Sequence, residues 1–131
     1  MKILIVEDDY TSRYGLEVML EKYGKCYLAE NGIEGYEVFE KEFIKGEPFD
    51  LICLDIMMPK MDGQEVLKKI RRYEMENNIV NFDKRAKIIM ISALNDYVNI
   101  KEAFWEICDD YLIKPIEEKN IIDKLKKLKL I

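Results

Sequence analysis

The sequence contains no histidine among its 131 residues. This absence excludes a Ser-His-Asp catalytic triad, a zinc site of the His-Glu-x-x-His type and a role as a phosphohistidine carrier. Cysteine is scarce as well, because only Cys26, Cys53 and Cys108 are present, far apart and within apolar runs. Their odd number and wide spacing support neither paired disulfides nor a Cys-x-x-Cys metal site, and we expect them to be small core residues.

Long apolar runs are also missing. No stretch approaches the roughly 18 consecutive apolar residues that a membrane span needs. Only four strongly apolar residues precede the first acidic group, too few for a signal peptide. We therefore expect a cytoplasmic protein without membrane insertion. The formal net charge of −5 argues against direct binding of nucleic acid, which requires clustered basic surface.

Five short apolar segments alternate with longer segments whose apolar residues recur at helical spacing. The short segments predict the strands Ile3–Val6, Cys26–Ala29, Phe49–Leu54, Ile88–Ile91 and Tyr111–Ile113. Five such β–α units predict an α/β fold, in which a doubly wound, five-stranded parallel sheet carries five helices on its two faces. A length of 131 residues, 49% of them hydrophobic, suits one domain with a substantial core.

Each expected helix has one apolar face. The residues expected to lie inward are, in chain order, Leu16, Met19, Leu20 and Tyr23; Ile33, Tyr36, Phe39 and Phe43; Val66, Leu67 and Ile70; Ile100, Phe104 and either Ile107 or Cys108; and Ile121, Ile122, Leu125 and Leu128. Thr11 or Ser12 is available to cap the first helix, and Asn31-Gly32 forms a turn or cap before the second. Gly63 is expected to supply backbone freedom at the start of the third. Residues 77–84 have no clean period and predict a connection that is long for a compact α/β unit.

Four of the expected strands end on polar residues. Glu7-Asp8-Asp9 follows the first strand, Asp55 the third, Ser92 the fourth and Lys114-Pro115 the fifth. Taken alone, an Asp before a Met-Met-Pro segment would usually just start a turn. The repetition at four strand ends favours a site instead, because open α/β sheets bind ligands at the carboxyl ends of their strands. We therefore expect Glu7, Asp8 and Asp55 to lie together where the first and third strands end.

Such a cluster of carboxylates has a limited range of chemistry. The three groups repel one another, so a proton or a cation must hold them together. Oxygen ligands in a partly solvated pocket favour a hard ion, and we predict Mg²⁺. Beside Mg²⁺, Asp55 is placed to attack a phosphorus atom as a covalent nucleophile, with Lys114 and Ser92 contacting the phosphoryl oxygens. The Lys114–Pro115 bond is a candidate cis peptide.

The motifs at the strand ends resemble the receiver domain of two-component response regulators. The resemblance rests on Glu7-Asp8, Leu54-Asp55-Ile-Met-Met-Pro-Lys-Met-Asp-Gly63, Ile91-Ser92-Ala93 and Tyr111-Leu-Ile-Lys114-Pro115. It covers essentially the whole chain and implies one receiver domain over residues 1–131, with no output domain. It also implies the flavodoxin-like strand order 2-1-3-4-5.

The resemblance implies a metal-assisted phosphoacceptor. Asp55 would accept a phosphoryl group from the phosphohistidine of a partner kinase. Asp8 and Asp55 would bind Mg²⁺ directly, together with the Met57 backbone carbonyl, and Glu7 would act through a water molecule. The pair Glu7-Asp8 is favoured over Asp8-Asp9, because the family's acidic pair directly follows the strand.

The resemblance also implies a switch. Ser92 and Tyr111 stand where the family has its switch hydroxyl and its switch aromatic residue. Phosphorylation would then pull Ser92 toward the phosphoryl oxygens and let Tyr111 turn inward. The shift would remodel the surface formed by the fourth and fifth strands and the helices after them.

The implied partners are proteins. A sensor histidine kinase or a phosphotransfer protein would act upstream, and a downstream protein target would receive the signal, because no output domain follows the last expected helix. The protein would accept a phosphoryl group, and at most remove it again, rather than turn over a substrate.

The alternative is a Mg²⁺-dependent phosphohydrolase with an Asp55 nucleophile. The haloacid-dehalogenase family, which uses an Asp nucleophile, places a second Asp two residues later. This chain has Met57 there, so a phosphohydrolase of that type would lack its general acid.

Overall fold

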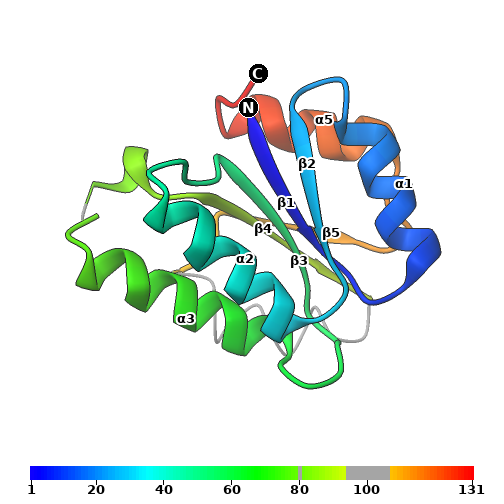
Figure 1. Ribbon diagram of the computed structural model, residues 1–131. Helices are drawn as coiled ribbons and strands as arrows, with labels where there is room; N and C mark the ends of the chain where they lie inside the picture. Colours follow the sequence, from blue (N-terminus) through cyan, green and yellow to red (C-terminus); the bar gives the residue numbers. More distant parts are fainter. Residues whose placement is uncertain (80, 94–106) are drawn as a thin grey trace.

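The computed structural model describes residues 1–79, 81–93 and 107–131. Its strands are β1 (Lys2–Val6), β2 (Lys25–Ala29), β3 (Leu51–Asp55), β4 (Lys87–Ser92) and β5 (Asp110–Ile113). Its α-helices are α1 (Tyr10–Leu20), α2 (Gly32–Ile44), α3 (Gly63–Glu76) and α5 (Glu118–Lys127), and a short 3₁₀ helix, η1, spans Phe82–Lys84. Figure 1 shows the path of the chain through these elements.

The five strands form one sheet in the order β2-β1-β3-β4-β5, and every neighbouring pair is parallel. The predicted sheet and its strand order are therefore confirmed. The described residues contain four α-helices of the five expected. The expected helix around Ile100 and Phe104 falls on residues 94–106, which lie outside the described part of the chain.

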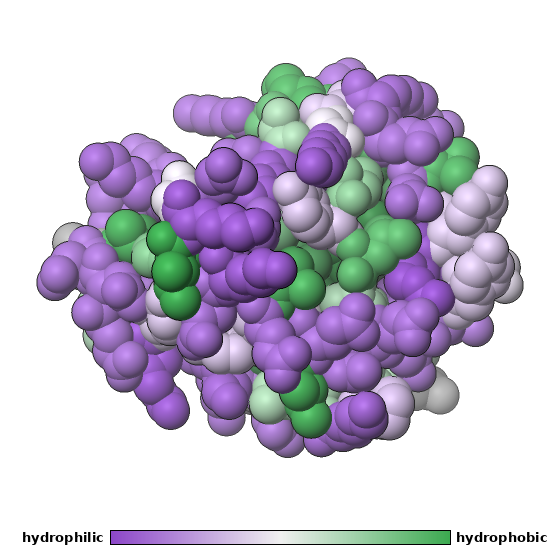
Figure 2. Space-filling model, in the orientation of Figure 1, coloured by the Kyte–Doolittle hydropathy of each residue, from purple (hydrophilic) through white to green (hydrophobic). Residues whose placement is uncertain are grey.

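Alternate residues of the strands contribute to two cores. Ile3 and Ile5 of β1 pack with residues of α1 and α5, whereas Leu4 and Val6 pack with residues of α2 and α3. The helices accordingly cover the two faces of the sheet in pairs, as Figure 1 shows. All five residues of β3 are buried, as expected for a parallel strand that is covered on both sides. Most of the surface in Figure 2 is hydrophilic, with smaller apolar areas between.

The inward faces of the described helices agree with the sequence pattern at most positions. The residues that are buried as expected are Leu16, Leu20, Phe39, Val66, Leu67, Ile70, Ile121 and Leu125. The prediction for Ile33 was wrong, because its side chain is 42% exposed. The buried residues in this part of α2 are Gly32 and Gly35. A Cβ atom on Gly35 would lie 2.8 Å from the side chain of Val6, so the helix approaches β1 too closely for a large inward residue there.

The helix caps follow side-chain geometry. The expected cap of α1 at Thr11 or Ser12 was wrong, because the helix already begins at Tyr10. Asp9 caps it instead, and Asp9 Oδ2 accepts a hydrogen bond of 2.9 Å from the Ser12 backbone N–H. Asn31 caps α2 as expected, through a bond of 2.9 Å from the Glu34 N–H.

A buried ionic network closes the connection between α3 and β4. Arg71 donates to Glu74 Oε1 at 2.7 Å, to the Ala86 carbonyl at 2.8 Å, to the Ile107 carbonyl at 2.7 Å and to Asp109 Oδ2 at 2.8 Å. Glu74 Oε2 in turn accepts from the Ala86 N–H at 2.9 Å. The long connection, which includes η1, is therefore fixed near both of its ends.

The three cysteines lie in or against the two cores. Cys53 and Cys108 are buried as expected, and Cys26 is half-buried. Burial raises the pKa of the Cys53 thiol to about 12 and that of Cys26 to about 11, so both stay protonated and poorly reactive at neutral pH. Among the described residues, no helix combines the length and the apolar character that crossing a membrane requires.

Candidate functional site

The carboxyl ends of β1 and β3 bring three acidic side chains together. Glu7 follows β1 directly and is fully buried, Asp55 is the last residue of β3 and is 3% exposed, and Asp8 is exposed. One carboxylate oxygen from each lies within 4.8 Å of the others. We call these three residues the acidic cluster. The expected meeting of Glu7, Asp8 and Asp55 is found at the expected edge of the sheet.

Lys114 reaches the acidic cluster from the end of β5. Its Nζ atom lies 3.0 Å from Glu7 Oε2 and 3.6 Å from Asp55 Oδ2. Its backbone N–H donates to the Ser92 carbonyl at 2.8 Å, which ties the end of β5 to the end of β4. The Lys114–Pro115 peptide bond is cis. One ammonium group therefore offsets part of the charge of three carboxylates.

The electrostatics of the site leave it short of positive charge. Burial and the nearby Glu7 carboxylate raise the pKa of Asp55 to about 7, and Lys114 only partly opposes this rise. Burial would lower the pKa of Lys114, but its contacts with Glu7 and Asp55 outweigh that effect and hold it above the usual value. Carboxylate oxygens whose negative charge is only partly neutralised are the donor set that a Mg²⁺ ion prefers. The residues therefore fit this ion.

Asp9 does not belong to the cluster. Its side chain caps α1, and hydrogen bonds from Ser12 hold the pKa of Asp9 below its usual value. The two neighbouring acids thus differ in their surroundings: Asp8 faces the other carboxylates, and Asp9 faces the first turn of a helix.

The other residues singled out by the sequence lie around the cluster. Ser92 ends β4 with 1% of its surface exposed, and its Oγ has no hydrogen-bond partner among the described residues. Tyr111 lies in β5, is 8% exposed and packs in the core under α2 and α3. Its ring is thus already inward here, so burial of Tyr111 alone would not distinguish two states. Met57 lies in the β3–α3 loop, and its side chain is 63% exposed.

Two further residues support the site: Gly63, for which the sequence predicted a different role, and Arg13, which the sequence analysis did not single out. A Cβ atom on Gly63 would lie 2.2 Å from the Asp55 carbonyl oxygen, so Gly63 is required for close approach rather than for the backbone freedom that we expected. Arg13 is 9% exposed and donates from Nη1 to the Glu7 carbonyl at 2.9 Å. Its helical spacing from Leu16 and Leu20 is a usable signal, because it puts a cation on the apolar face of α1.

Comparison with known proteins identifies the family. The model of the response regulator receiver domain matches residues 3–126. The chemotaxis protein CheY of Treponema pallidum is 32% identical over 126 residues, which are 95% of this chain and 79% of that protein. The transcriptional regulatory protein SrrA of Staphylococcus aureus is 32% identical over 97% of this chain, which spans only 47% of SrrA.

Solved structures agree with this assignment. A CheY-like receiver domain protein from Methanospirillum hungatei is 27% identical with a TM-score of 0.75, and the match covers 98% of this chain and 92% of that one. In the complex of the Saccharomyces cerevisiae phosphotransfer protein Ypd1 with the receiver domain of Ssk1, the matching chain is 28% identical with a TM-score of 0.79, over 98% of this chain and 88% of that one. The protein therefore belongs to the response regulator receiver domain family of two-component signalling.

Proposed function

We propose that Asp55 accepts a phosphoryl group from the phosphohistidine of a partner protein, in a reaction that depends on Mg²⁺. The observation that carries this proposal is the geometry around Asp55. A nearly buried carboxylate at a strand end has an ammonium nitrogen 3.6 Å away and two further carboxylates within 4.8 Å of its oxygens. Carboxylates are known covalent nucleophiles toward phosphorus when positive charge is arranged around the transferring group.

The chain supplies the nucleophile and part of the charge. A carboxylate oxygen of Asp55 forms a bond to phosphorus, the bond from phosphorus to the partner's imidazole nitrogen breaks, and that nitrogen keeps the electron pair. Lys114 would contact one phosphoryl oxygen, and the Ser92 hydroxyl would donate a hydrogen bond to another. Asp8, Asp55 and the Met57 carbonyl would hold Mg²⁺, with Glu7 acting through water. When bound, the ion supplies positive charge against the phosphoryl oxygens.

The upstream partner is a sensor histidine kinase or a phosphotransfer protein. Support comes from the similarity to the Ssk1 receiver domain, which was solved in complex with a histidine phosphotransfer protein. The phosphorylated form would then act on a downstream protein through the surface around β4 and β5. The protein would work in the cytoplasm as a phosphoacceptor rather than as a turnover enzyme.

The test is phosphorylation of the purified protein by a small phosphodonor with Mg²⁺. Intact-mass measurement should show one added phosphoryl group in the parent and none in Asp55→Asn. Asp123→Asn, which changes an exposed aspartate on α5, is the matched control and should be labelled like the parent. Labelling of Asp55→Asn would disprove the assignment. Steady release of phosphate from a generic phosphomonoester would favour the phosphohydrolase instead.

A further inference from the structure

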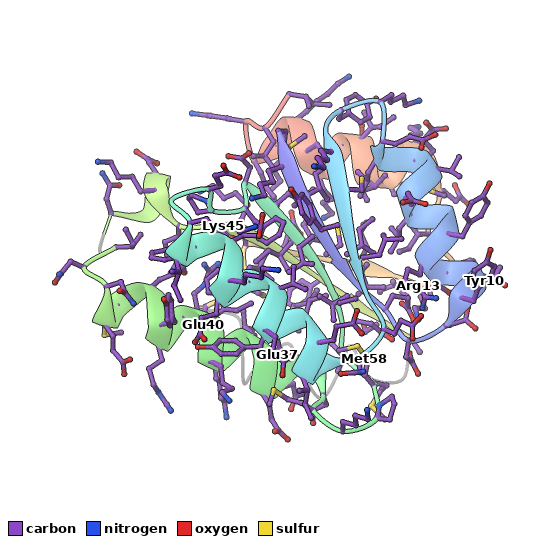
Figure 3. All side chains as sticks on the ribbon, viewed as in Figure 1. Tyr10, Arg13, Glu37, Glu40, Lys45 and Met58 are labelled. Carbon is purple, nitrogen blue, oxygen red and sulfur yellow. The ribbon has the colours of Figure 1, made fainter. Side chains whose placement is uncertain are left out.

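Arg13 is a buried cation next to the acidic cluster, although the proposed chemistry gives it no role. It lies in α1 with 9% of its surface exposed, on the face that also carries the buried residues Leu16 and Leu20. Figure 3 labels it near the end of the molecule where Met58 lies in the β3–α3 loop. A guanidinium group taken out of water is costly unless its N–H donors find partners. The partners of the Arg13 guanidinium group therefore indicate the role of this residue.

Three of these contacts lie within the β1–α1 segment. Nη1 donates to the Glu7 carbonyl at 2.9 Å and, over a longer 3.4 Å, to the Asp8 carbonyl. The guanidinium carbon lies 5.6 Å from the centre of the Tyr10 ring. The fourth contact is an ion pair of 3.5 Å from Nη2 to Glu30 Oε1, which lies beyond β2. Arg13 thus joins α1 to the backbone of two members of the acidic cluster.

Glu7 is restrained through its backbone N–H and carbonyl and through both of its carboxylate oxygens. Its N–H donates to the Ala29 carbonyl at 3.1 Å, its Oε1 accepts from the Asp9 N–H at 3.1 Å, and its Oε2 lies 3.0 Å from Lys114 Nζ. The bond from Arg13 fixes the remaining backbone oxygen. Asp8 is exposed and lies between the end of β1 and the start of α1, so the donation to its carbonyl restrains a residue that the sheet no longer holds.

We propose that Arg13 is a positioning residue for the acidic cluster, an inference that rests on the phosphoacceptor function proposed for Asp55. By holding the Glu7 and Asp8 carbonyls, Arg13 directs their side chains toward Asp55, where the divalent cation would be held. It contacts neither the phosphoryl group nor the ion. Partners that orient the ligands of a metal typically contribute about 10- to 100-fold to metal affinity.

The direction in which Mg²⁺ affinity changes when Arg13 is replaced distinguishes a positioning role from a simple effect of its charge. Arg13 is positively charged, so charge repulsion alone predicts that its removal would tighten binding of Mg²⁺. Loss of positioning predicts the opposite, because the carboxylates would no longer converge. Arg13→Lys sharpens the comparison, since lysine keeps the charge but lacks the planar fork of donors. Electrostatics predicts no change in this variant, whereas positioning predicts weaker binding.

The experiment measures Mg²⁺ affinity calorimetrically on the full chain, at a temperature where thermal unfolding shows every variant to be folded. We expect the dissociation constant to rise about 10-fold in Arg13→Gln and by a smaller factor in Arg13→Lys. Arg72→Gln, which removes an exposed positive charge from α3, should bind Mg²⁺ as the parent does. Labelling by the small phosphodonor at subsaturating Mg²⁺ should slow in the same order.

Unchanged or tighter Mg²⁺ binding in Arg13→Gln would overturn the positioning role of Arg13. A loss of stability with unchanged affinity would overturn it too, because a purely structural residue would give that result. If Arg13→Gln does not fold, Arg13→Lys decides alone, and an affinity equal to the parent's would overturn the proposal. A parent that binds Mg²⁺ but takes no phosphoryl group would refute the phosphoacceptor function, while the affinities would still test Arg13.

Discussion

Asp8 and Asp9 are adjacent acids with different structural tasks. Asp8 contributes an oxygen to the acidic cluster, and Asp9 accepts the hydrogen bond that caps α1. The difference arises because the chain turns here: it leaves β1 at Val6 and enters α1 at Tyr10. The Asp8 side chain therefore lies with the other carboxylates, and the Asp9 side chain lies against the first turn of α1. Two substitutions at successive positions should therefore affect different properties.

We predict that Asp8→Ala weakens Mg²⁺ binding, because it removes one of the expected ligands. The variant should not lose stability, because the removed group is one of three mutually repelling carboxylates. Asp9→Ala should retain Mg²⁺ binding and lose about 1 kcal/mol of stability through the missing cap. Calorimetric titration and urea unfolding of both variants test this pair. Equal losses of affinity in the two variants would show that the register of the acidic pair is mistaken.

The stability of the metal-free protein should depend on pH through Asp55. The pKa of Asp55 is raised from 3.8 to about 7 by burial and by Glu7, so the folded metal-free protein binds this proton more tightly than the unfolded chain does. The resulting stability is fully present below the unfolded pKa and is lost as pH rises through about 7. Asp55→Asn, which is neutral at every pH, should therefore be more stable than the parent at pH above about 7 and nearly equal at low pH.

Thermal unfolding in a chelating buffer, from acid to mildly alkaline pH, checks this sign. Addition of Mg²⁺ should raise the unfolding temperature of the parent more than that of Asp55→Asn. A parent that gains stability over Asp55→Asn as pH rises would contradict the assignment of this proton to Asp55.

At the scale of elements, glycines decide how closely α3 and the end of β3 approach each other. A Cβ atom on Gly63 would meet the Asp55 carbonyl oxygen at 2.2 Å and the Ile56 Cα at 2.8 Å, both of which are backbone atoms. A Cβ atom on Gly15, inside α1, would meet nothing within 4 Å. Both positions are helical, so the same substitution tests space at one and helix propensity at the other.

Gly63→Ala should destabilise the protein by about 1–3 kcal/mol, because backbone atoms at the end of β3 must move. Gly15→Ala should stabilise it by about 0.5–1 kcal/mol, since alanine is the better helix former. Urea unfolding measures both. Because the displaced carbonyl belongs to Asp55, Gly63→Ala should also slow phosphorylation. A neutral or stabilising Gly63→Ala would show that the strand end yields easily.

The ionic network of Arg71 works between elements too. It joins α3 to the start of β4 and to Asp109, just before β5. Arg71→Met should cost about 3–5 kcal/mol, because Glu74 would be left as a buried charge without its cation and Asp109 would keep only the longer ion pair with Arg85, at 3.8 Å. Arg72→Met, at the neighbouring exposed position, should change stability by less than about 0.5 kcal/mol. A loss below about 1 kcal/mol in Arg71→Met would mean that the network relaxes into water.

At the scale of the whole molecule, Ser92 connects the site at Asp55 with β5. Ser92 ends the strand next to Asp55, its carbonyl accepts from the Lys114 N–H at 2.8 Å, and its hydroxyl has no partner in the described part of the chain. A phosphoryl oxygen would offer this hydroxyl an acceptor. Any movement of Ser92 would act on β5, because Ser92 pairs with Ile113 across the sheet.

We predict that Ser92→Ala still accepts the phosphoryl group but loses the conformational response. Hydrogen exchange should show a phosphorylation-dependent change in β4 and β5 of the parent, and little change in the variant. Ser92→Thr keeps a hydroxyl and serves as the control that should retain the response. An unchanged response in Ser92→Ala would remove Ser92 from the switch.

Features that depend on neighbouring residues could be predicted from the sequence, whereas features that depend on contacts between distant residues could not. Strand positions and the convergence of Glu7, Asp8 and Asp55 were predicted, because buried strands are apolar runs and their polar ends must meet at one edge of a parallel sheet. The strand order came from the resemblance to receiver domains. The cap of α1 was mispredicted, since Thr11 or Ser12 was expected to cap the helix and Asp9, although disfavoured as a metal ligand, was not considered as its cap. The burial of Ile33 was mispredicted, because helical spacing does not reveal that Gly32 and Gly35 occupy the inward positions.

The sequence by itself determined the order of elements and the chemistry at the strand ends, because periodicity and strand-end polarity are local properties of the chain. Only the tertiary structure decided which partners each polar group has. The contact of Arg13 with the Glu7 carbonyl, the space required at Gly63 and the bonds of Arg71 to Ile107 and Asp109 all depend on distances between separate elements. Such distances are set by packing of the two cores, which no short stretch of sequence encodes.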